Sequence, residues 1–194
     1  MFDTVLIAGL GLMGGSMAKT IKARTLSRVL GWNRTRATAE QALADGSIDA
    51  IATEALYKEA DLVIIGLYPQ ATVDWLLENM PKMKKGCVIV DMVGVKQFMV
   101  DHLEQAALDA GVHYVGGHPM AGREFSGLDY SLPTLFDGAS MIFVPTKSST
   151  ERVLEQLEAY FMSLGFGQTV RCTAQQHDHM IAFTSQLAHV VSSA

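Results

Sequence analysis

The chain has 194 residues, a hydrophobic content of 49% and a formal net charge of −5, a balance that indicates a globular protein rather than a disordered one. Its basic residues are scattered and no apolar run reaches membrane-spanning length, so neither nucleic acid nor a membrane is an expected partner. The two cysteines, Cys87 and Cys172, are too few for a disulfide framework, and we therefore expect a cytoplasmic location.

Apolar runs alternate with amphipathic stretches along the chain. In chain order, the sequence predicts strands at residues 4–8, 29–32, 62–67, 87–90, 112–115 and 141–144. Helices are predicted between most of these strands, at residues 14–23, 36–45, 70–80 and 96–110. Continuous apolar runs are typical of strands that are buried on both faces, and strand–helix alternation is typical of crossover connections. The predicted fold class is therefore α/β, with a Rossmann-type, doubly wound and mainly parallel sheet.

The first predicted strand leads directly into a glycine-rich turn, GLGLMG at residues 9–14. In a dinucleotide-binding turn, Gly9 permits the sharp bend, Gly11 lets a pyrophosphate approach the backbone, and Gly14 lets the helix pack on the strand. The phosphates bind at the N-terminus of that helix, so Leu12 and Met13 are also expected at the cofactor. Glycine-rich turns also occur for purely structural reasons, but this position between a strand and a helix favours nucleotide binding.

The second predicted strand is followed by Asn33, where NAD-binding domains usually carry an acidic residue that holds the ribose hydroxyls. Arg34 and Arg36 follow, and guanidinium groups match the oxygens of a 2′-phosphate. We therefore expect NADP rather than NAD as the cofactor. The alternative is NAD bound through Asn33, with both arginines solvated at the start of a helix.

Three further segments are expected beyond the carboxyl ends of strands, where an open parallel sheet binds its ligands. The strand at 62–67 runs into Leu67, Tyr68 and Pro69, of which the proline would stop the strand and form a floor for the cofactor. The next strand leads into residues 91–96, which contain Gly94. The strand at 112–115 leads to His118, whose neutral imidazole would take a proton from a hydroxyl as hydride leaves the same carbon. An exposed loop histidine without a catalytic role is the alternative.

Residues 177–189 have the spacing of a helix. Asp178, Ala182, Ser185 and His189 share one face because they are separated by four, three and four positions. This face would line a site, or it would form a packing seam with His189 in a core. No spacing of His, Cys or carboxylate residues in the chain matches a metal motif, so no metal is expected.

Motifs more specific than the glycine turn occur in order along the chain. They are D-x-x-x-V-K at 91–96, GGHPMAG-x-E at 116–124, SG-x-x-x-S at 126–131, LF-x-G at 135–138 and HD-x-x-x-A-x-x-S-x-L-x-H at 177–189. Together with GLGLMGGS at 9–16, they resemble the prephenate/arogenate (cyclohexadienyl) dehydrogenase family of tyrosine biosynthesis.

The resemblance implies NAD(P)-dependent oxidative decarboxylation of prephenate to 4-hydroxyphenylpyruvate, or of arogenate to tyrosine. It identifies His118 with the family's catalytic histidine, which hydrogen-bonds the ring hydroxyl and assists proton removal. It places Glu124 near the substrate entrance, and it assigns Ser185, Gln186 and His189 to the substrate pocket.

The chain departs from the family's pattern at three places. Gly94 stands where some relatives carry a serine that contacts the nicotinamide and the substrate hydroxyl, and residues 185–189 read SQLAH instead of SHLPH. The family also continues into a helical domain that forms the dimer and supplies an arginine for the substrate carboxylate. We therefore interpret residues 1–172 as the dinucleotide-binding domain and 173–194 as the first helix of a truncated helical domain. We expect this stretch alone to bind cofactor and turn over poorly, and the full-length protein to be a homodimer.

Two other functions fit the sequence. One is an NADP-linked dehydrogenase of the β-hydroxyacid type, which ordinarily relies on a lysine on the interdomain helix; the chain has no lysine from residue 172 onward. The other is a dinucleotide-binding module without turnover. The motifs do not distinguish prephenate from arogenate as the substrate.

Overall fold

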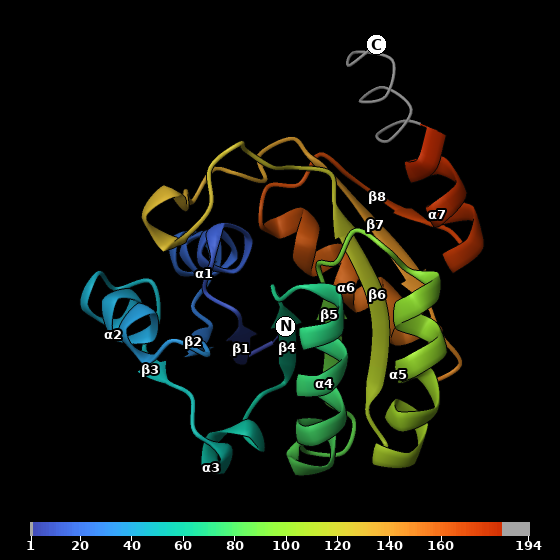
Figure 1. Ribbon diagram of the computed structural model, residues 1–194, viewed down its shortest axis with the longest axis horizontal. Coiled ribbons are helices and arrows are strands. Elements are labelled where there is room, and N and C mark those ends of the chain that lie inside the picture. The colour runs from blue at the N-terminus through green and yellow to red at the C-terminus, as the bar shows by residue number, and fades with distance from the viewer. Residues whose placement is uncertain (1, 184–194) are drawn as a thin grey trace.

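One eight-stranded sheet runs through the structure, a computed structural model that describes residues 2–183 (Figure 1). Every neighbouring pair of strands is parallel except β6 and β7, which are antiparallel. In the order of the sheet, the strands are β3 (Ala50–Ile51), β2 (Arg28–Trp32), β1 (Thr4–Ala8), β4 (Leu62–Ile65), β5 (Val88–Asp91), β6 (His113–Pro119), β7 (Ser140–Pro145) and β8 (Gln168–Arg171).

Helices cover both faces of this sheet and bury an apolar core on each (Figure 1). One core is closed by α1 (Leu12–Arg24), α2 (Arg36–Ala44) and α6 (Glu151–Ser163). The other is closed by α3 (Glu54–Tyr57), α4 (Pro69–Asn79) and α5 (Gln97–Ala110). Two short 3₁₀ helices, η1 (Met80–Lys82) and η2 (Leu128–Tyr130), complete the connections, and α7 (Ala174–Ile181) packs against α5.

The sheet order reverses at β1 and β4, which lead into helices on opposite faces. The turn from β1 into α1 is tight because Gly9 has a φ of +95°, which side chains disfavour. A Cβ at Gly14 would lie 1.8 Å from the carbonyl oxygen of Gly9, so α1 approaches the strand this closely only with glycine there. The two strand ends and this turn leave a crevice at the carboxyl edge of the sheet, which is where such folds bind ligands.

The predicted doubly wound, mainly parallel sheet is confirmed, with corrections to its elements. The strand predicted to run to residue 67 ends at Ile65, and Pro69 begins α4 instead of stopping a strand, because proline suits the first helical position. The strand predicted at 112–115 extends to Pro119, so His118 lies inside β6. The sequence did not predict β3, α3, α6 or β8; β8 is an edge strand with mostly exposed residues, so it lacks an apolar run.

None of the helices within residues 2–183 is long and apolar enough to cross a membrane. In the same part of the chain, no group of three or more His, Cys, Asp or Glu side chains is arranged to hold a metal ion.

Candidate active site

A cavity of about 480 Å³ lies at the carboxyl ends of β1, β2 and β4, where the strand order reverses. Its walls come from the glycine turn, from the segment after β2 and from the start of α4. The lining contains six of the residues predicted to bind a cofactor: Gly9, Gly11, Asn33, Arg34, Leu67 and Tyr68.

The geometry of this cavity fits a nucleotide. A Cβ at Gly11 would meet no atom within 4 Å, so a ligand can reach the backbone there. Gly11 is also the N-cap of α1, and neither a capping side chain nor an acidic residue in the first turn occupies that helix end, which therefore suits an anion. The buried indole Nε1 of Trp75, which lines the same cavity, has no hydrogen-bond partner within residues 2–183. The cavity thus offers the backbone N–H groups at the start of α1 to a phosphate.

Alanine substitutions at two glycines of the turn are expected to separate folding from binding. Gly14→Ala places a methyl group against the Gly9 carbonyl, so α1 must shift, and we expect a loss of about 1–3 kcal/mol in unfolding free energy by urea titration. Gly11→Ala has no neighbour to displace, so its stability should stay within about 0.5 kcal/mol while nucleotide affinity falls. Unchanged stability of the first variant, or unchanged affinity of the second, would contradict this account of the turn.

The three residues predicted to select the cofactor differ in their surroundings. Asn33 Oδ1 accepts the backbone N–H of Leu10 at 3.0 Å, and its Nδ2 donates to a carbonyl two residues further on at 3.1 Å, so this amide braces the glycine turn. Arg34 is exposed and lines the cavity. Arg36 lies in α2 and pairs with Glu40, with Nε and Oε1 2.8 Å apart. Of the two arginines, Arg34 is therefore the one positioned at the cavity.

A smaller cavity of about 310 Å³ shares part of this wall and reaches toward the end of β5. It is completed by Met92 and by residues 125–127, which belong to the exposed segment that also carries Glu124. Pro69, at the first position of α4, lines neither cavity. Five of the residues predicted at the cofactor line this second cavity: Gly11, Leu12, Met13, Leu67 and Tyr68.

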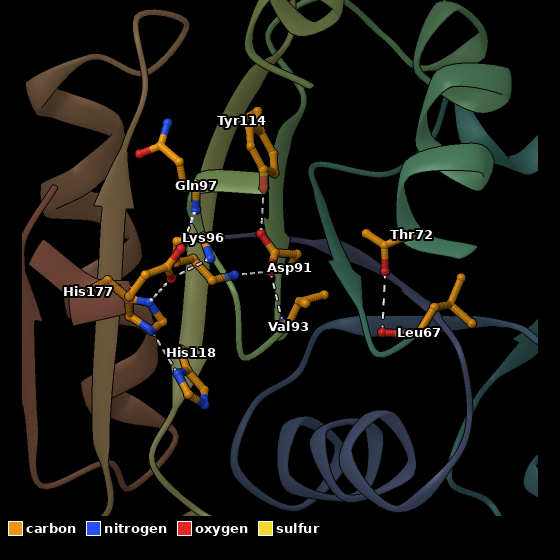
Figure 2. Close-up of polar contacts among 10 residues, drawn as sticks. Leu67, Thr72, Asp91, Val93, Lys96, Gln97, Tyr114, His118 and His177 are labelled. Carbon is orange, nitrogen blue, oxygen red and sulfur yellow. Dashed lines mark hydrogen bonds and ion pairs between the residues drawn. The ribbon is translucent and has the colours of Figure 1, made fainter. Parts of the chain in front are cut away.

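His118 is connected to α7 by a series of hydrogen bonds (Figure 2). Its Nδ1 lies 2.8 Å from Nε2 of His177, and Nδ1 of His177 lies 2.8 Å from Oδ1 of Asp178. The carboxylate of Asp178 also accepts the backbone N–H groups of Lys96 at 2.8 Å and Gln97 at 2.9 Å, at the start of α5. The imidazole of His118 is therefore held by α7, which is in turn fixed to the start of α5 through Asp178.

A buried ion pair holds the adjoining strand ends together (Figure 2). The side chains of Lys96 and Asp91 are fully buried and pair through Nζ and Oδ1. Asp91 Oδ1 also accepts the backbone N–H of Val93 at 2.8 Å, and Oδ2 accepts the hydroxyl of Tyr114 at 2.6 Å. Both carboxylate oxygens thus have partners, as a buried charge requires.

The environment of His118 keeps its imidazole neutral at physiological pH. Burial lowers the pKa of His118 to about 4, and the positive charge of Lys96, together with that of His177 when it is protonated, acts in the same direction. Asp91 and Asp178 oppose this shift but do not cancel it. Burial also lowers the pKa of His177. For Asp178, burial acts to raise the pKa, but the hydrogen bonds it accepts lower it overall.

Gly94 lies beside the imidazole of His118. A Cβ at Gly94 would be 3.7 Å from Nε2 of His118, an ordinary contact distance. Met92, two residues earlier, lines the smaller cavity. The short segment 92–94 therefore lies between the smaller cavity, which shares a wall with the larger one, and His118, the catalytic candidate.

Sequence reasoning recovered part of this site. Ser185, Gln186 and His189, predicted to bind substrate, lie outside the described residues. The sequence does not predict His177 as a partner of His118, and it predicts Asp178 only on a helix face that lines a site or forms a packing seam. The pairing of His177 with Asp178 is local, but its contact with His118 spans 59 positions, and no spacing rule predicts such a contact.

The fold, the glycine turn and the cleft define a nucleotide-binding domain of the Rossmann type. Residues 17–168 match the family described as "Prephenate dehydrogenase, nucleotide-binding domain", and the chain belongs to this family.

Proteins that are similar to the chain in sequence or in structure are named prephenate or arogenate dehydrogenases. It is 33% identical over 198 residues to a prephenate dehydrogenase of Bacillus subtilis (strain 168), in a match that covers 100% of this chain and 53% of that protein. A solved prephenate dehydrogenase from A. aeolicus, in complex with hydroxyphenyl propionate and NAD⁺, has a TM-score of 0.89 and 27% identity, covering 98% of this chain and 67% of that one.

A solved arogenate dehydrogenase from Synechocystis has a TM-score of 0.86 and 25% identity, covering 98% of this chain and 68% of that one. The chain thus spans about half the length of the Bacillus relative and about two thirds of the two solved structures.

Proposed function

We propose that the chain provides the cofactor site and the catalytic histidine of an NAD(P)-dependent prephenate or arogenate dehydrogenase. The observation that carries the proposal is His118, which is half-buried, held neutral and connected to the nucleotide cleft by segment 92–94. Relatives named for both activities share its fold. The β-hydroxyacid alternative is not favoured, because the chain belongs to the prephenate dehydrogenase domain family.

The residues of the cleft suit a dinucleotide. Gly11 and the first turn of α1 would hold the pyrophosphate, and the ring of Trp32, which packs against Trp75 with their centroids 5.5 Å apart, would line the wall at the adenosine end. Leu67 and Tyr68 would continue the wall toward Gly94 and the reacting end. A nicotinamide bound there supplies the hydride acceptor for the reaction.

His118 would act as the base. Its neutral Nε2 would accept the proton of the ring hydroxyl while the carbon that bears this hydroxyl loses hydride. Loss of the ring carboxylate as carbon dioxide then leaves its electron pair in the ring, which becomes an aromatic phenolate, and the proton held by His118 returns to this oxygen. Burial helps here, because an imidazole that stays neutral is ready to accept a proton across the physiological pH range.

We infer a preference for NADP from Arg34. Arg34→Ala is expected to weaken NADP binding about 10–100-fold, the loss of a hydrogen bond to a charged group, and to leave NAD binding within about twofold. Both tryptophans of the chain line the cavity, so their fluorescence can report both titrations. Arg36→Ala is the control, because Arg36 already pairs with Glu40 and is expected to change the preference less. Equal effects of Arg34→Ala on both cofactors would instead favour the NAD alternative.

We also propose that residues 1–172 are the dinucleotide-binding domain and that residues 173–194 belong to a second, helical domain through which the full-length protein would form a homodimer. Ser185, Gln186 and His189 would bind the substrate. Glu124 belongs to the exposed segment beside the smaller cavity, which is consistent with a substrate entrance. Two free cysteines, one buried, are consistent with a cytoplasmic location.

The proposed function is tested by steady-state turnover of the full-length protein with each substrate and each cofactor. Prephenate and arogenate are each combined with NAD and NADP, and formation of reduced cofactor is followed by absorbance. Turnover with at least one pair is the expected result and assigns both specificities. Tight cofactor binding without turnover in any of the four combinations would favour a binding module instead.

A further inference from the structure

The hydrogen bonds that connect Asp178, His177 and His118 can be assigned donors and acceptors, starting from the carboxylate of Asp178. Oδ1 of Asp178 already accepts the backbone N–H of Lys96, and it lies 2.8 Å from Nδ1 of His177. A carboxylate oxygen has only acceptor capacity. Nδ1 of His177 must therefore carry the proton, because a lone pair facing the carboxylate would be repelled.

The protonation of His177 then determines that of His118. The His177 ring is fully buried, and this burial lowers its pKa, so the ring is neutral at physiological pH. A neutral imidazole has one donor and one acceptor nitrogen, so Nε2 of His177 is an acceptor. Its neighbour 2.8 Å away, Nδ1 of His118, is consequently the donor.

We propose that His177 and Asp178 are positioning residues that hold His118 in its Nδ1–H form, so that Nε2 presents its lone pair on the Gly94 side of the ring. This role rests on the proposed function only for its catalytic consequence, since the protonation state itself follows from the contacts. The arrangement uses no atom of the substrate or the cofactor, so it is in place before either binds.

The same series prepares His118 for the charge that it acquires. When Nε2 of His118 accepts a proton, the ring becomes an imidazolium whose Nδ1–H already points at His177. The negative charge of Asp178 lies two hydrogen bonds away and stabilises this cation. Lys96 opposes that stabilisation, and Asp91, paired with Lys96, offsets part of its effect. Because Asp178 also receives the first N–H groups of α5, its carboxylate cannot rotate away without uncapping that helix.

Nuclear magnetic resonance of the full-length protein with ¹⁵N-labelled histidine tests the inference without requiring turnover. The ring nitrogen shifts and their two-bond couplings identify which nitrogen of His118 is protonated, with the signal assigned by its loss in His118→Asn. The expected result is Nδ1–H in the parent protein at neutral pH. In His177→Phe, which fills the space but accepts no hydrogen bond, the signal should move toward the Nε2–H form.

Steady-state kinetics of the same variants distinguish a positioning role of His177 from a general loss of structure around the site. His177→Phe should lower kcat about tenfold or more, while KM for substrate and cofactor changes less than about twofold. His177→Gln, whose amide oxygen can accept the proton of Nδ1, should recover part of that loss. His179→Gln is the matched control, since His179 is exposed on the same helix and should leave kcat and the His118 signal unchanged.

Two results would overturn the inference. One is an Nε2–H form of His118 in the parent protein. The other is a His177→Phe variant that keeps both the parent signal and a kcat within about twofold of the parent value. A parent protein that shows Nδ1–H and responds to His177→Phe, but converts neither prephenate nor arogenate, would support the positioning role and contradict the proposed function instead.

Discussion

Replacing His118 with asparagine is expected to lower kcat by a factor of about 10²–10⁴, the usual contribution of a general base. Asparagine fits the half-buried site but cannot accept a proton at neutral pH. Cofactor affinity should be retained, because His118 lies outside the cavity that Trp32 and Trp75 line, and tryptophan fluorescence measures this directly. Loss of activity together with loss of cofactor binding would indicate a structural role for the histidine instead.

The pH dependence of activity in the parent protein is a second test of His118, because it reports the pH at which this histidine becomes protonated. A base acts only when unprotonated, and burial lowers the pKa of His118 from 6.5 to about 4. Activity should therefore stay level as the pH falls through 6.5 and decline only near pH 4, about tenfold per pH unit below it. The pH profile of kcat/KM is the one to measure, because it reports the pKa of the base in the free enzyme. A decline centred on pH 6.5 would mean that His118 is solvated before substrate binds.

The alternation of strands and helices could be predicted because the interior of a doubly wound sheet demands it. Strands such as β4, buried on both faces, can only be built from continuous apolar runs, and these are visible in the sequence. The edge strand β8 has mostly exposed residues and gave no such signal. The helix before it, α6, was not predicted although its buried residues recur at helical spacing. Within residues 1–172, helices were predicted only between pairs of apolar strands, and β8, the strand that follows α6, has no apolar run.

The site could be predicted only where its residues are fixed by local geometry. The glycine turn depends on neighbours in sequence, so Gly9, Gly11 and Gly14 could be assigned separate roles. The observed turn agrees with the structural roles of Gly9 and Gly14, and the contact of Gly11 with a pyrophosphate stays a prediction. The contact between His118 and His177 depends on where α7 docks, which no local pattern encodes. Lys96 was recognised as part of a motif, but its burial depends on the packing of β6 and α5 around it.

Lys96→Met is expected to destabilise the protein by about 3–5 kcal/mol, the usual cost of removing one partner from a buried ion pair. Both side chains of the pair are fully buried, so Asp91 would keep its charge without a counter-ion or would have to take up a proton. Urea unfolding measures the loss. Lys82→Met is the control at the surface, where Lys82 pairs with the largely exposed Glu54, and we expect it to change the unfolding free energy far less than Lys96→Met does.

A double variant distinguishes an unpaired charge from simple loss of packing. Asp91→Asn combined with Lys96→Met removes both charges and keeps an amide oxygen that can accept the backbone N–H of Val93, while the amide nitrogen can donate to the hydroxyl oxygen of Tyr114. If the lone carboxylate is what destabilises Lys96→Met, the double variant should be more stable than the single one, since uncharged pairs often replace buried ion pairs at little cost. If packing of the aliphatic part of the Lys96 side chain contributes more to stability than its charge, the double variant would be no more stable than Lys96→Met. The first outcome would show that the unpaired carboxylate of Asp91, and not the loss of packing, is what destabilises Lys96→Met.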